Sequence, residues 1–330
     1  MILNNNSIGA VVIGRNEGER LRVCLESIRE QLKYVIYVDS GSTDSSVELA
    51  ESLGVYVVNL DLTIPFTAAR ARNEGAKALL KINPQIEFIQ FVDGDCEVQA
   101  DWLDKAYAFL KEADPYAIVC GRRRERYPDA SVLNKLCDIE WNTPIGDTKS
   151  CGGDALIRVK AFLQVNGYRE SLIAGEEPEM CFRMRQQGGK IRRLDAEMTL
   201  HDAAMTKVSQ WWKRHKRAGH AYAESYDLHG RSTEQFRKHD CMKILFWGAA
   251  FPLSTAFLCF FNIMFAWLFL VYPLQVIRLT FKYFRQFKQL KPSFFYALSN
   301  VASKLAQFNG LFSFYINKLR GKANTIIEYK

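Results

Sequence analysis

Apolar and polar positions along the first part of the chain alternate between strand-like and helix-like periods. Residues 8–13 form an apolar run, and the segment 19–31 behind it has the period of a helix. A second apolar run, 34–38, ends in a polar loop whose Thr43 or Asp44 is suited to capping the next helix. Two strand–loop–helix units in succession predict a parallel sheet, and ligands bind beyond the carboxyl ends of such strands.

A later apolar run ends in the sequence Asp93-Gly94-Asp95. Two carboxylates beside a glycine, which has no side chain, leave room for a phosphate and a hard divalent cation to approach. The parallel sheet is expected to bring Asp93 to the same edge as Asn16 and Asp39. Asp-Gly-Asp also occurs in plain turns, and a turn carboxylate is an alternative for Asp39 as well.

Polar motifs follow one another in a definite order between residues 7 and 220. They are Gly14-Arg15-Asn16-Glu17, Asp39-Ser40-Gly41-Ser42-Thr43-Asp44, Ala71-Arg72-Asn73-Glu74-Gly75, Asp93-Gly94-Asp95, Cys151-Gly152-Gly153-Asp154, and Gly175-Glu176-Glu177-Pro178-Glu179 with Arg183 and Arg185. In this order they resemble the family 2 glycosyltransferases. The resemblance implies a GT-A type, Rossmann-like α/β fold with a mixed, mainly parallel sheet flanked by helices. It also implies inverting transfer of a sugar from a nucleoside diphosphate donor.

The resemblance assigns the donor nucleotide to residues at this sheet edge. Asp39 is similar to the aspartate that hydrogen-bonds the base, and Arg72 occupies the position of a basic residue that meets the nucleoside or its phosphates. Asp93 matches the aspartate that faces the ribose. The residues implied in donor binding are Arg15, Asn16, Glu17, Asp39, Arg72, Asp93 and Gly153. A UDP-sugar is the expected donor.

The same resemblance implies a divalent cation. Asp95 matches the metal-facing aspartate, and some enzymes of this fold place a histidine at a position comparable to His201, on the metal or the diphosphate. Mn²⁺ or Mg²⁺ fits the oxygen ligands, and a neutral imidazole is a reasonable third ligand. Such a cation stabilises the charge that grows on a diphosphate leaving group. Two strand-like segments, 191–194 and 198–200, are predicted to lead to His201. The alternative for His201 is a hydrogen bond within a loop.

Direct displacement needs a base on the opposite face of the sugar, and we expect Glu177 to take the proton from the acceptor hydroxyl. The family more often has Glu-Asp where this chain has Glu176-Glu177. Because Pro178 favours the first turn of a helix, Glu177 is predicted at or just before the N-cap of a helix over 179–187. The alternative is that these acidic residues serve only to start the helix.

Cysteine spacing and charge narrow the class of protein. The eight cysteines have no close pair such as Cys-x-x-Cys, which favours buried free thiols in a reducing compartment over a disulfide framework or a zinc site. Residues 278–330 carry a net charge of +9 and the rest of the chain −1, so the basic charge belongs to a tail. Nucleic-acid binding, which needs a basic surface on the folded domain, is not indicated. Arg122-Arg123-Arg124 is predicted to be a solvated strand end.

Residues 244–277 contain no charged side chain over 34 positions. One membrane span takes about 20 apolar residues, so this run favours a hairpin that breaks near Asn262. Basic residues flank both ends, which favours the cytoplasmic side for both. The alternative is a buried helix pair in a soluble core. The apolar positions of 294–319 predict an amphipathic helix, either in the membrane interface or packed on the catalytic domain.

These patterns predict a catalytic domain over 1–235 and a membrane-associating helical region with a basic tail over 236–330. We expect an inverting glycosyltransferase on the cytoplasmic side of the membrane, with a lipid-linked or polysaccharide acceptor in surface polysaccharide or glycolipid synthesis. One alternative is a sugar-1-phosphate nucleotidyltransferase, although residues 14–18 are too short and too acidic for its phosphate loop. Another is a catalytically silent membrane scaffold that binds a nucleotide sugar, although such a protein has no chemical need for a base.

Overall fold

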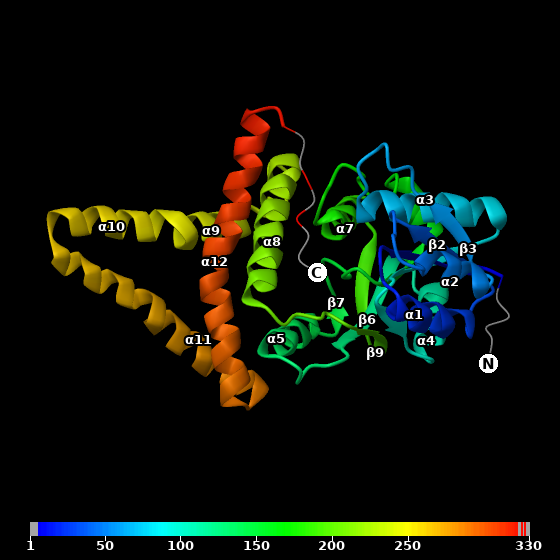
Figure 1. Ribbon diagram of the computed structural model, residues 1–330, viewed down its shortest axis with the longest axis horizontal. Coiled ribbons are helices and arrows are strands. Elements are labelled where there is room, and N and C mark those ends of the chain that lie inside the picture. The colour runs from blue at the N-terminus through cyan, green and yellow to red at the C-terminus, as the bar shows by residue number, and fades with distance from the viewer. Residues whose placement is uncertain (1–5, 323–324, 326, 328–330) are drawn as a thin grey trace. The chain divides into compact units, whose positions relative to one another are not determined.

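A computed structural model describes residues 6–322, 325 and 327 of the 330-residue chain. The chain folds into two compact units, and Figure 1 shows the elements of each. The first, here called the sheet unit, contains the chain up to Arg126 together with Glu140–Ala203. The second, the helical unit, contains Tyr127–Ile139 and the chain from Ala204 onward.

The compact units divide the chain earlier than the predicted functional boundary at residue 235. Helix α8 (Val208–His229) belongs to the helical unit because it packs along the last helix, α12 (Leu290–Leu319). The assignment of catalysis to residues 1–235 stays a prediction, since compactness alone does not say which residues contact a substrate.

The sheet unit is built on a nine-stranded sheet in the order β3-β2-β1-β4-β8-β6-β9-β5, with β7 paired to β9. Strands β1 to β4, β6 and β9 run in one direction and β5, β7 and β8 in the other, so the sheet is mixed and mainly parallel, as predicted. The strands are β1 (Ile8–Gly14), β2 (Tyr34–Asp39), β3 (Tyr56–Asn59), β4 (Phe88–Asp93), β5 (Cys96–Val98), β6 (Tyr116–Glu125), β7 (Gly146–Asp147), β8 (Ala155–Arg158) and β9 (Lys190–His201).

Helices flank this sheet and cover its apolar residues. They are α1 (Glu19–Arg29), α2 (Ser46–Ser52), α3 (Ala68–Ile82), α4 (Trp102–Glu112), α6 (Val159–Gln164) and α7 (Glu176–Gln186), while α5 (Val132–Trp141) crosses from one unit to the other. Gly75 of α3 lies so close to β1 that a Cβ there would meet Val11 Cγ1 at 2.3 Å. The absent side chain lets α3 approach the strand, and this sets Arg72, one turn earlier, above the strand ends.

The register of the parallel strands aligns the predicted polar residues. Gly14 lies opposite Asp39 in the β1–β2 pair, and Ile13 lies opposite Asp93 in the β1–β4 pair. The loops after β1, β2 and β4 therefore begin at the same level of the sheet. This confirms the predicted convergence at the carboxyl edge.

Three local predictions differ from the structure. Helix α2 is capped by neither Thr43 nor Asp44: its N-cap is Ser45, and Asp44 accepts a hydrogen bond from the Ser46 N–H group. Helix α7 begins at Glu176 and not at residue 179, because Gly175 adopts a left-handed conformation with φ 77° and turns the chain into the helix. The two strands expected at 191–194 and 198–200 are one strand, β9, whose register against β6 is irregular.

The helical unit contains the predicted apolar hairpin. Its first arm is α9 (Lys238–Leu245), a π-helical turn (Phe246–Ala250) and α10 (Phe251–Phe261), and its second is a 3₁₀ segment (Ile263–Leu270) and α11 (Val271–Phe287). The break falls at Asn262, which is extended and whose side chain accepts a hydrogen bond from the Met264 N–H group. The hairpin and its break are thus confirmed.

Each arm of the hairpin is long and apolar enough to cross a membrane, over Lys238–Phe261 and Ile263–Phe287. Only 22% of the most apolar window of the first arm and 6% of that of the second are buried inside the protein. Phe260 is 87% exposed and Trp267 is 71% exposed. Figure 1 shows α10 and α11 projecting away from α12. The alternative of a buried core pair is therefore wrong for the described chain.

The amphipathic helix predicted over 294–319 is present as α12 and packs on α8. A Cβ at Gly219 would lie 1.9 Å from the Gln307 carbonyl oxygen, and one at Gly310 would lie 1.8 Å from that of Lys216. The two helices therefore cross backbone to backbone at two glycines. Trp211 Nε1 donates to Ser299 Oγ at 2.9 Å near one end of the contact.

Candidate active site

Asp39 lies at the end of β2 and organises the loop behind it. Its Oδ1 accepts hydrogen bonds from Tyr37 Oη at 2.9 Å and Ser42 Oγ at 2.5 Å. Its Oδ2 accepts from the backbone N–H groups of Gly41 at 2.9 Å and Ser42 at 2.8 Å. A carboxylate has about four acceptor positions, and these bonds occupy all of them. A nucleobase that donates a hydrogen bond to Asp39 must displace one of these four bonds. The half-buried Ser42 hydroxyl is freer to rotate than the fully buried Tyr37.

The loop after β1 is joined to the loop after β2. Asn16, at φ 56°, accepts a hydrogen bond from the Thr43 N–H group at 2.7 Å and donates its own N–H to Ser42 Oγ at 2.9 Å. The Arg15 guanidinium lies over the Phe66 ring, 4.8 Å from its centroid. Two residues after Arg15, Glu17 pairs with the Arg20 guanidinium at 2.8 Å. The fold thus gathers the predicted donor residues Arg15, Asn16, Glu17 and Asp39 in two connected loops.

Arg72 joins Asp93 to the start of α7. Its Nη2 lies 2.7 Å from Asp93 Oδ1, and its Nη1 lies 2.8 Å from Glu176 Oε1. Burial alone would lower the pKa of Arg72, but the two carboxylates raise it, so the guanidinium stays charged. In the fold Arg72 is a positioning residue, which fixes the end of β4 relative to the acidic turn of α7.

A second arginine on Asp93 was not predicted. Arg123 Nη2 donates to Asp93 Oδ2 at 2.9 Å, and Arg123 Nε donates to Asp154 Oδ2 at 2.9 Å. Asp154 is fully buried and accepts further bonds from the Asp93 N–H group at 3.1 Å and from Thr199 Oγ1 at 2.8 Å. Burial raises the pKa of Asp93, but Arg72 and Arg123 outweigh it and hold the pKa below its usual value. Asp93 is therefore an anion at neutral pH.

The prediction that Arg122-Arg123-Arg124 is a solvated strand end is wrong for its first two residues. Arg122 is buried, and the Arg123 side chain is 15% exposed, whereas Arg124 is 48% exposed and pairs with Glu197. The register of β6 against β9 shifts between Arg122 and Arg123. Side chains alternate between the faces of a strand, so one of three consecutive arginines in a strand is expected to point inward. That alternation of side chains was the signal in the sequence that at least one of these arginines is buried.

Gly153 lies against the same carboxylate. A Cβ at this position would meet Asp93 Oδ2 at 2.8 Å and Arg123 Nη2 at 3.1 Å. Real Cβ atoms do not approach other atoms that closely, so a side chain at position 153 would have to displace the ion pair. The missing side chain therefore lets the backbone at Gly153 lie directly against the Asp93–Arg123 ion pair.

Asp95 and His201 meet through the pairing of β5 with β9. Cys96 lies opposite His201 in that antiparallel pair, and His201 Nε2 lies 3.3 Å from Asp95 Oδ1. The Trp141 ring stands edge-on to the imidazole, with centroids 4.7 Å apart. The alternative in which His201 bonds only within its own loop does not hold, because it is the last residue of β9 and faces the Asp-Gly-Asp turn.

Glu177 lies in the first turn of α7, buried behind this edge. Its Oε1 accepts the Cys151 N–H group at 2.6 Å and lies 3.0 Å from Cys181 Sγ. Burial raises the pKa of Glu177, although these hydrogen bonds act in the opposite direction. The ion pair with Arg72 is made by Glu176 and not by Glu177. The two adjacent glutamates therefore have different surroundings, one charged and one apolar.

The sequence model of the family described as glycosyl transferase family 2 matches residues 10–149. This stretch contains β1 to β6 and the loops that carry Asn16, Asp39, Asp93 and Asp95. Over this stretch the chain is similar to the glycosyl transferases of family 2. The family 2 match ends just before Cys151, so Gly153, Glu177 and His201 lie beyond it.

Curated relatives are distant and of several kinds. Glycosyltransferase AglE of Haloferax volcanii is 28% identical over 151 residues, which cover 43% of this chain and 48% of that protein. The succinoglycan biosynthesis protein ExoA of Rhizobium meliloti is 22% identical over 278 residues and 78% of both chains. The pre-mycofactocin glycosyltransferase of Mycobacterium tuberculosis is 25% identical over 64% of this chain and 46% of its own. The chain thus spans about half the length of two of these three relatives.

Two solved structures resemble nearly the whole chain. A mannosyltransferase from Pyrobaculum calidifontis, in complex with GDP-Man and Mn²⁺, has a TM-score of 0.62 at 15% identity, covering 96% of this chain and 88% of its own. S. aureus TarS 1-349 has a TM-score of 0.50 at 13% identity, covering 96% and 92%. At these identities the likeness shows the fold, and the fold is GT-A.

The carboxyl edge of the sheet offers donor atoms that fit a divalent cation. A carboxylate oxygen of Asp95, the imidazole of His201 and the Cys96 sulfur all lie within 4.8 Å of one another. Carboxylate and imidazole suit Mn²⁺, while the Cys96 thiol is a ligand that a hard cation does not require. Burial raises the pKa of Cys96 well above its usual value, which keeps this thiol protonated.

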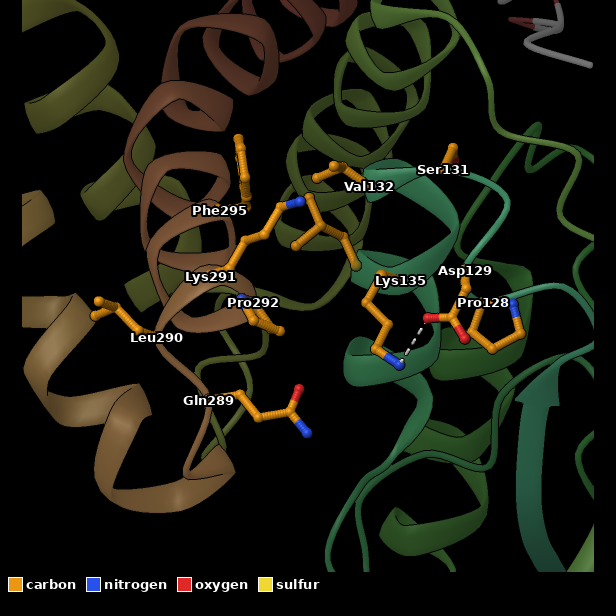
Figure 2. Close-up of a pocket in the computed structure, with 11 residues that line it drawn as sticks. Pro128, Asp129, Ser131, Val132, Lys135, Gln289, Leu290, Lys291, Pro292 and Phe295 are labelled. Carbon is orange, nitrogen blue, oxygen red and sulfur yellow. Dashed lines mark hydrogen bonds and ion pairs between the residues drawn. The ribbon is translucent and has the colours of Figure 1, made fainter.

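A pocket in the helical unit is separate from the donor residues. It is lined by α5 with the turn before it and by the start of α12 with Gln289 before it (Figure 2). Lys135 pairs with Asp129 at 3.4 Å on one side, and Lys291, Pro292 and Phe295 lie on the other. No residue predicted for the donor or metal is among the residues that line it.

Proposed function

We propose that the protein is an inverting, metal-dependent glycosyltransferase that takes a sugar from a nucleoside diphosphate donor, with a UDP-sugar as the first candidate. The observation that carries the proposal is the joint placement of Asp93, Asp95 and His201 at the carboxyl edge of a sheet whose first strands lie within the family 2 match. The relatives named as glycosyltransferases, and the solved fold neighbour that holds GDP-Man and Mn²⁺, support the same class of donor.

Each donor residue can be given a task from its surroundings. The connected loops around Asn16 and Asp39 receive the nucleoside, with a Ser42 rotation opening one acceptor position on Asp39. Asp93 is held ionised and in place by Arg72 and Arg123, so it accepts hydrogen bonds from ribose hydroxyls without changing its own position. Gly153 has no side chain that would displace the Asp93–Arg123 ion pair, so the carboxylate keeps its place for the donor.

Asp95 and His201 would hold the divalent cation, either Mn²⁺ or Mg²⁺. When bound, the cation would neutralise the negative charge that grows on the leaving diphosphate. The Trp141 ring limits rotation of the His201 imidazole and so keeps its Nε2 directed at Asp95.

We infer that Glu177 takes the proton of the acceptor hydroxyl. A carboxylate whose pKa is raised by burial is a stronger base than an exposed one, which suits proton abstraction near neutral pH. The hydrogen bond from the Cys151 N–H group fixes Oε1, so Oε2 is the atom assigned to the acceptor proton. Glu176, which is bound to Arg72, is a positioning residue for the donor side.

The acceptor is proposed to be lipid-linked or a polysaccharide, in the synthesis of a surface polysaccharide or glycolipid on the cytoplasmic side of a membrane. The exposed apolar hairpin and the basic residues at both of its ends support membrane attachment. The similarity to a succinoglycan biosynthesis protein supports a saccharide acceptor.

The test uses the purified full chain in detergent with a panel of UDP-, GDP- and TDP-sugars, Mn²⁺ or Mg²⁺, and membrane extract as the acceptor source. Metal-dependent release of one nucleoside diphosphate with labelled sugar in the acceptor fraction, both lost in Asp95→Asn, is the expected result. Release of pyrophosphate from a nucleoside triphosphate and a sugar phosphate would establish a nucleotidyltransferase instead. Saturable donor binding without turnover would establish the silent scaffold.

A further inference from the structure

Two cysteines that are far apart in sequence meet at Glu177. Cys151 precedes β8, and Cys181 lies one turn after Glu177 on α7. Their sulfur atoms are 3.7 Å apart, and they lie 3.1 Å and 3.0 Å from the same Glu177 Oε1. All three side chains are buried and both thiols are free. The fold therefore creates the close cysteine pair that the spacing along the sequence lacks.

We propose that Cys151, Cys181 and Glu177 form a binding site for a thiophilic divalent cation such as Zn²⁺. Two sulfurs on a tetrahedral zinc ion, at about 2.3 Å from the metal, lie about 3.8 Å apart. The two sulfur atoms lie 3.7 Å apart in the structure, which already matches that sulfur–sulfur distance. A zinc-bound carboxylate oxygen would lie about 3.6 Å from each sulfur, so Glu177 has to withdraw by about 0.5 Å.

The exchange is balanced in charge and atoms. Without a cation, two neutral thiols surround one carboxylate, and both sulfurs are within hydrogen-bond distance of it. A divalent cation releases the two thiol protons to solvent and forms two metal–sulfur bonds and one metal–oxygen bond. The local charge is −1 before and after binding, so the buried site gains no net charge. Three protein ligands leave one tetrahedral position for water.

This site differs in chemistry from the pair formed by Asp95 and His201. Thiolates select zinc and similar cations, whereas carboxylate and imidazole suit Mn²⁺ and Mg²⁺. One consequence rests on the proposed function, in which Glu177 is the base: a cation bound to Glu177 removes the proton acceptor. Zn²⁺ would then inhibit transfer, and an excess of Mg²⁺ would not relieve the inhibition.

The binding test does not depend on catalysis. The reduced full chain in detergent is titrated with Co²⁺, and thiolate-to-cobalt charge-transfer absorption is recorded. Excess Mg²⁺ is present to occupy the site of Asp95 and His201. We expect saturation at one Co²⁺ per chain and loss of the absorption on adding Zn²⁺. Cys181→Ser and Cys151→Ser should each lose most of the absorption, while Cys96→Ser and Cys241→Ser should keep it.

Several outcomes would overturn the site. They are the absence of charge-transfer absorption in the unaltered chain, its persistence in Cys181→Ser, or its loss in Cys96→Ser. Because a serine variant can fail to fold, each serine variant is compared with the unaltered chain by circular dichroism. Glu177→Gln keeps both sulfurs and should bind Co²⁺ with an affinity lowered at least tenfold. If the protein shows no transfer activity, the spectral result still stands and only the inhibitory consequence fails.

Discussion

Arg123 Nη2 lies 2.9 Å from Asp93 Oδ2, although 30 residues and a whole strand separate the two residues. Asp93 ends β4 and Arg123 lies in β6, and β8 is the strand between them. The guanidinium reaches Asp93 by lying along Asp154, the residue just before β8. Together with Arg72 on the other carboxylate oxygen, it holds Asp93 in one orientation.

Replacing Arg123 by methionine is expected to destabilise the protein and weaken donor binding. The change leaves two largely buried carboxylates without one of their cations, which costs about 3 kcal/mol in the free energy of unfolding. Arg124→Met is the matched control: the side chains of Arg124 and its partner Glu197 are each about half exposed, so the change should cost at most about 1 kcal/mol. Chemical unfolding of the full chain in detergent measures both. Equal losses in the two variants would contradict a special role for Arg123.

Gly153→Ala is expected to lower donor affinity because the new methyl group overlaps Asp93 Oδ2. Gly152→Ala is the control, since Gly152 has φ 81° and a Cβ there meets no atom within 4 Å. It should lose about 1 kcal/mol of stability through backbone strain and keep its donor affinity. Titration with the donor found in the panel distinguishes the two. Unchanged affinity in Gly153→Ala would mean that the donor does not approach Asp93 from this side.

Glu177→Gln and Glu176→Gln should separate the base from the positioning residue. Loss of a general base lowers the rate by about 10² or more, so Glu177→Gln should lower kcat and leave donor affinity nearly unchanged. Glu176→Gln weakens the hold on Arg72 and should mainly weaken donor binding. Initial rates at varied donor concentration give both parameters. Near-normal kcat in Glu177→Gln would remove this residue as the base.

The pH dependence of kcat should report the same carboxyl group. Because burial raises the pKa of Glu177 and the ionised form is the base, kcat should fall as the pH is lowered through a value above the ordinary glutamate pKa of about 4.3. Above that pKa, kcat should no longer change with pH. Rates at saturating donor between about pH 4 and pH 9 would show it. A limb at or below the ordinary glutamate range would conflict with a buried base.

The donor-binding edge could be predicted because its signals are local. An apolar run that ends in Asp-Gly-Asp, or in the loop after Asp39, shows both the strand and the place where it stops. Parallel pairing then brings such ends together without knowledge of individual contacts. The hairpin was equally accessible, since an uncharged run of 34 residues interrupted near Asn262 leaves few other conformations.

The rest of the site depends on contacts between distant segments. The inward turn of Arg123 follows from the irregular pairing of β6 with β9, and the meeting of Cys151 with Cys181 follows from the packing of α7 against β9 and α3. The early start of α7 depends on the left-handed Gly175, which propensity alone does not reveal. Glu177 stays a prediction as the base, and its thiol surroundings were not visible in the sequence.

Arginine substitutions in the hairpin are expected to weaken membrane attachment. Leu253 and Leu274 lie near the middle of the two arms and are 66% and 61% exposed, so in a bilayer they would contact lipid. An arginine at the centre of a bilayer costs about 3 kcal/mol in insertion free energy, and Leu253→Arg with Leu274→Arg should therefore shift the protein to the supernatant after ultracentrifugation. Leu163→Arg, at a 55% exposed apolar position on α6, controls for added charge and should still sediment. Full sedimentation of the double variant would show that the basic tail or another surface, and not the hairpin, anchors the protein.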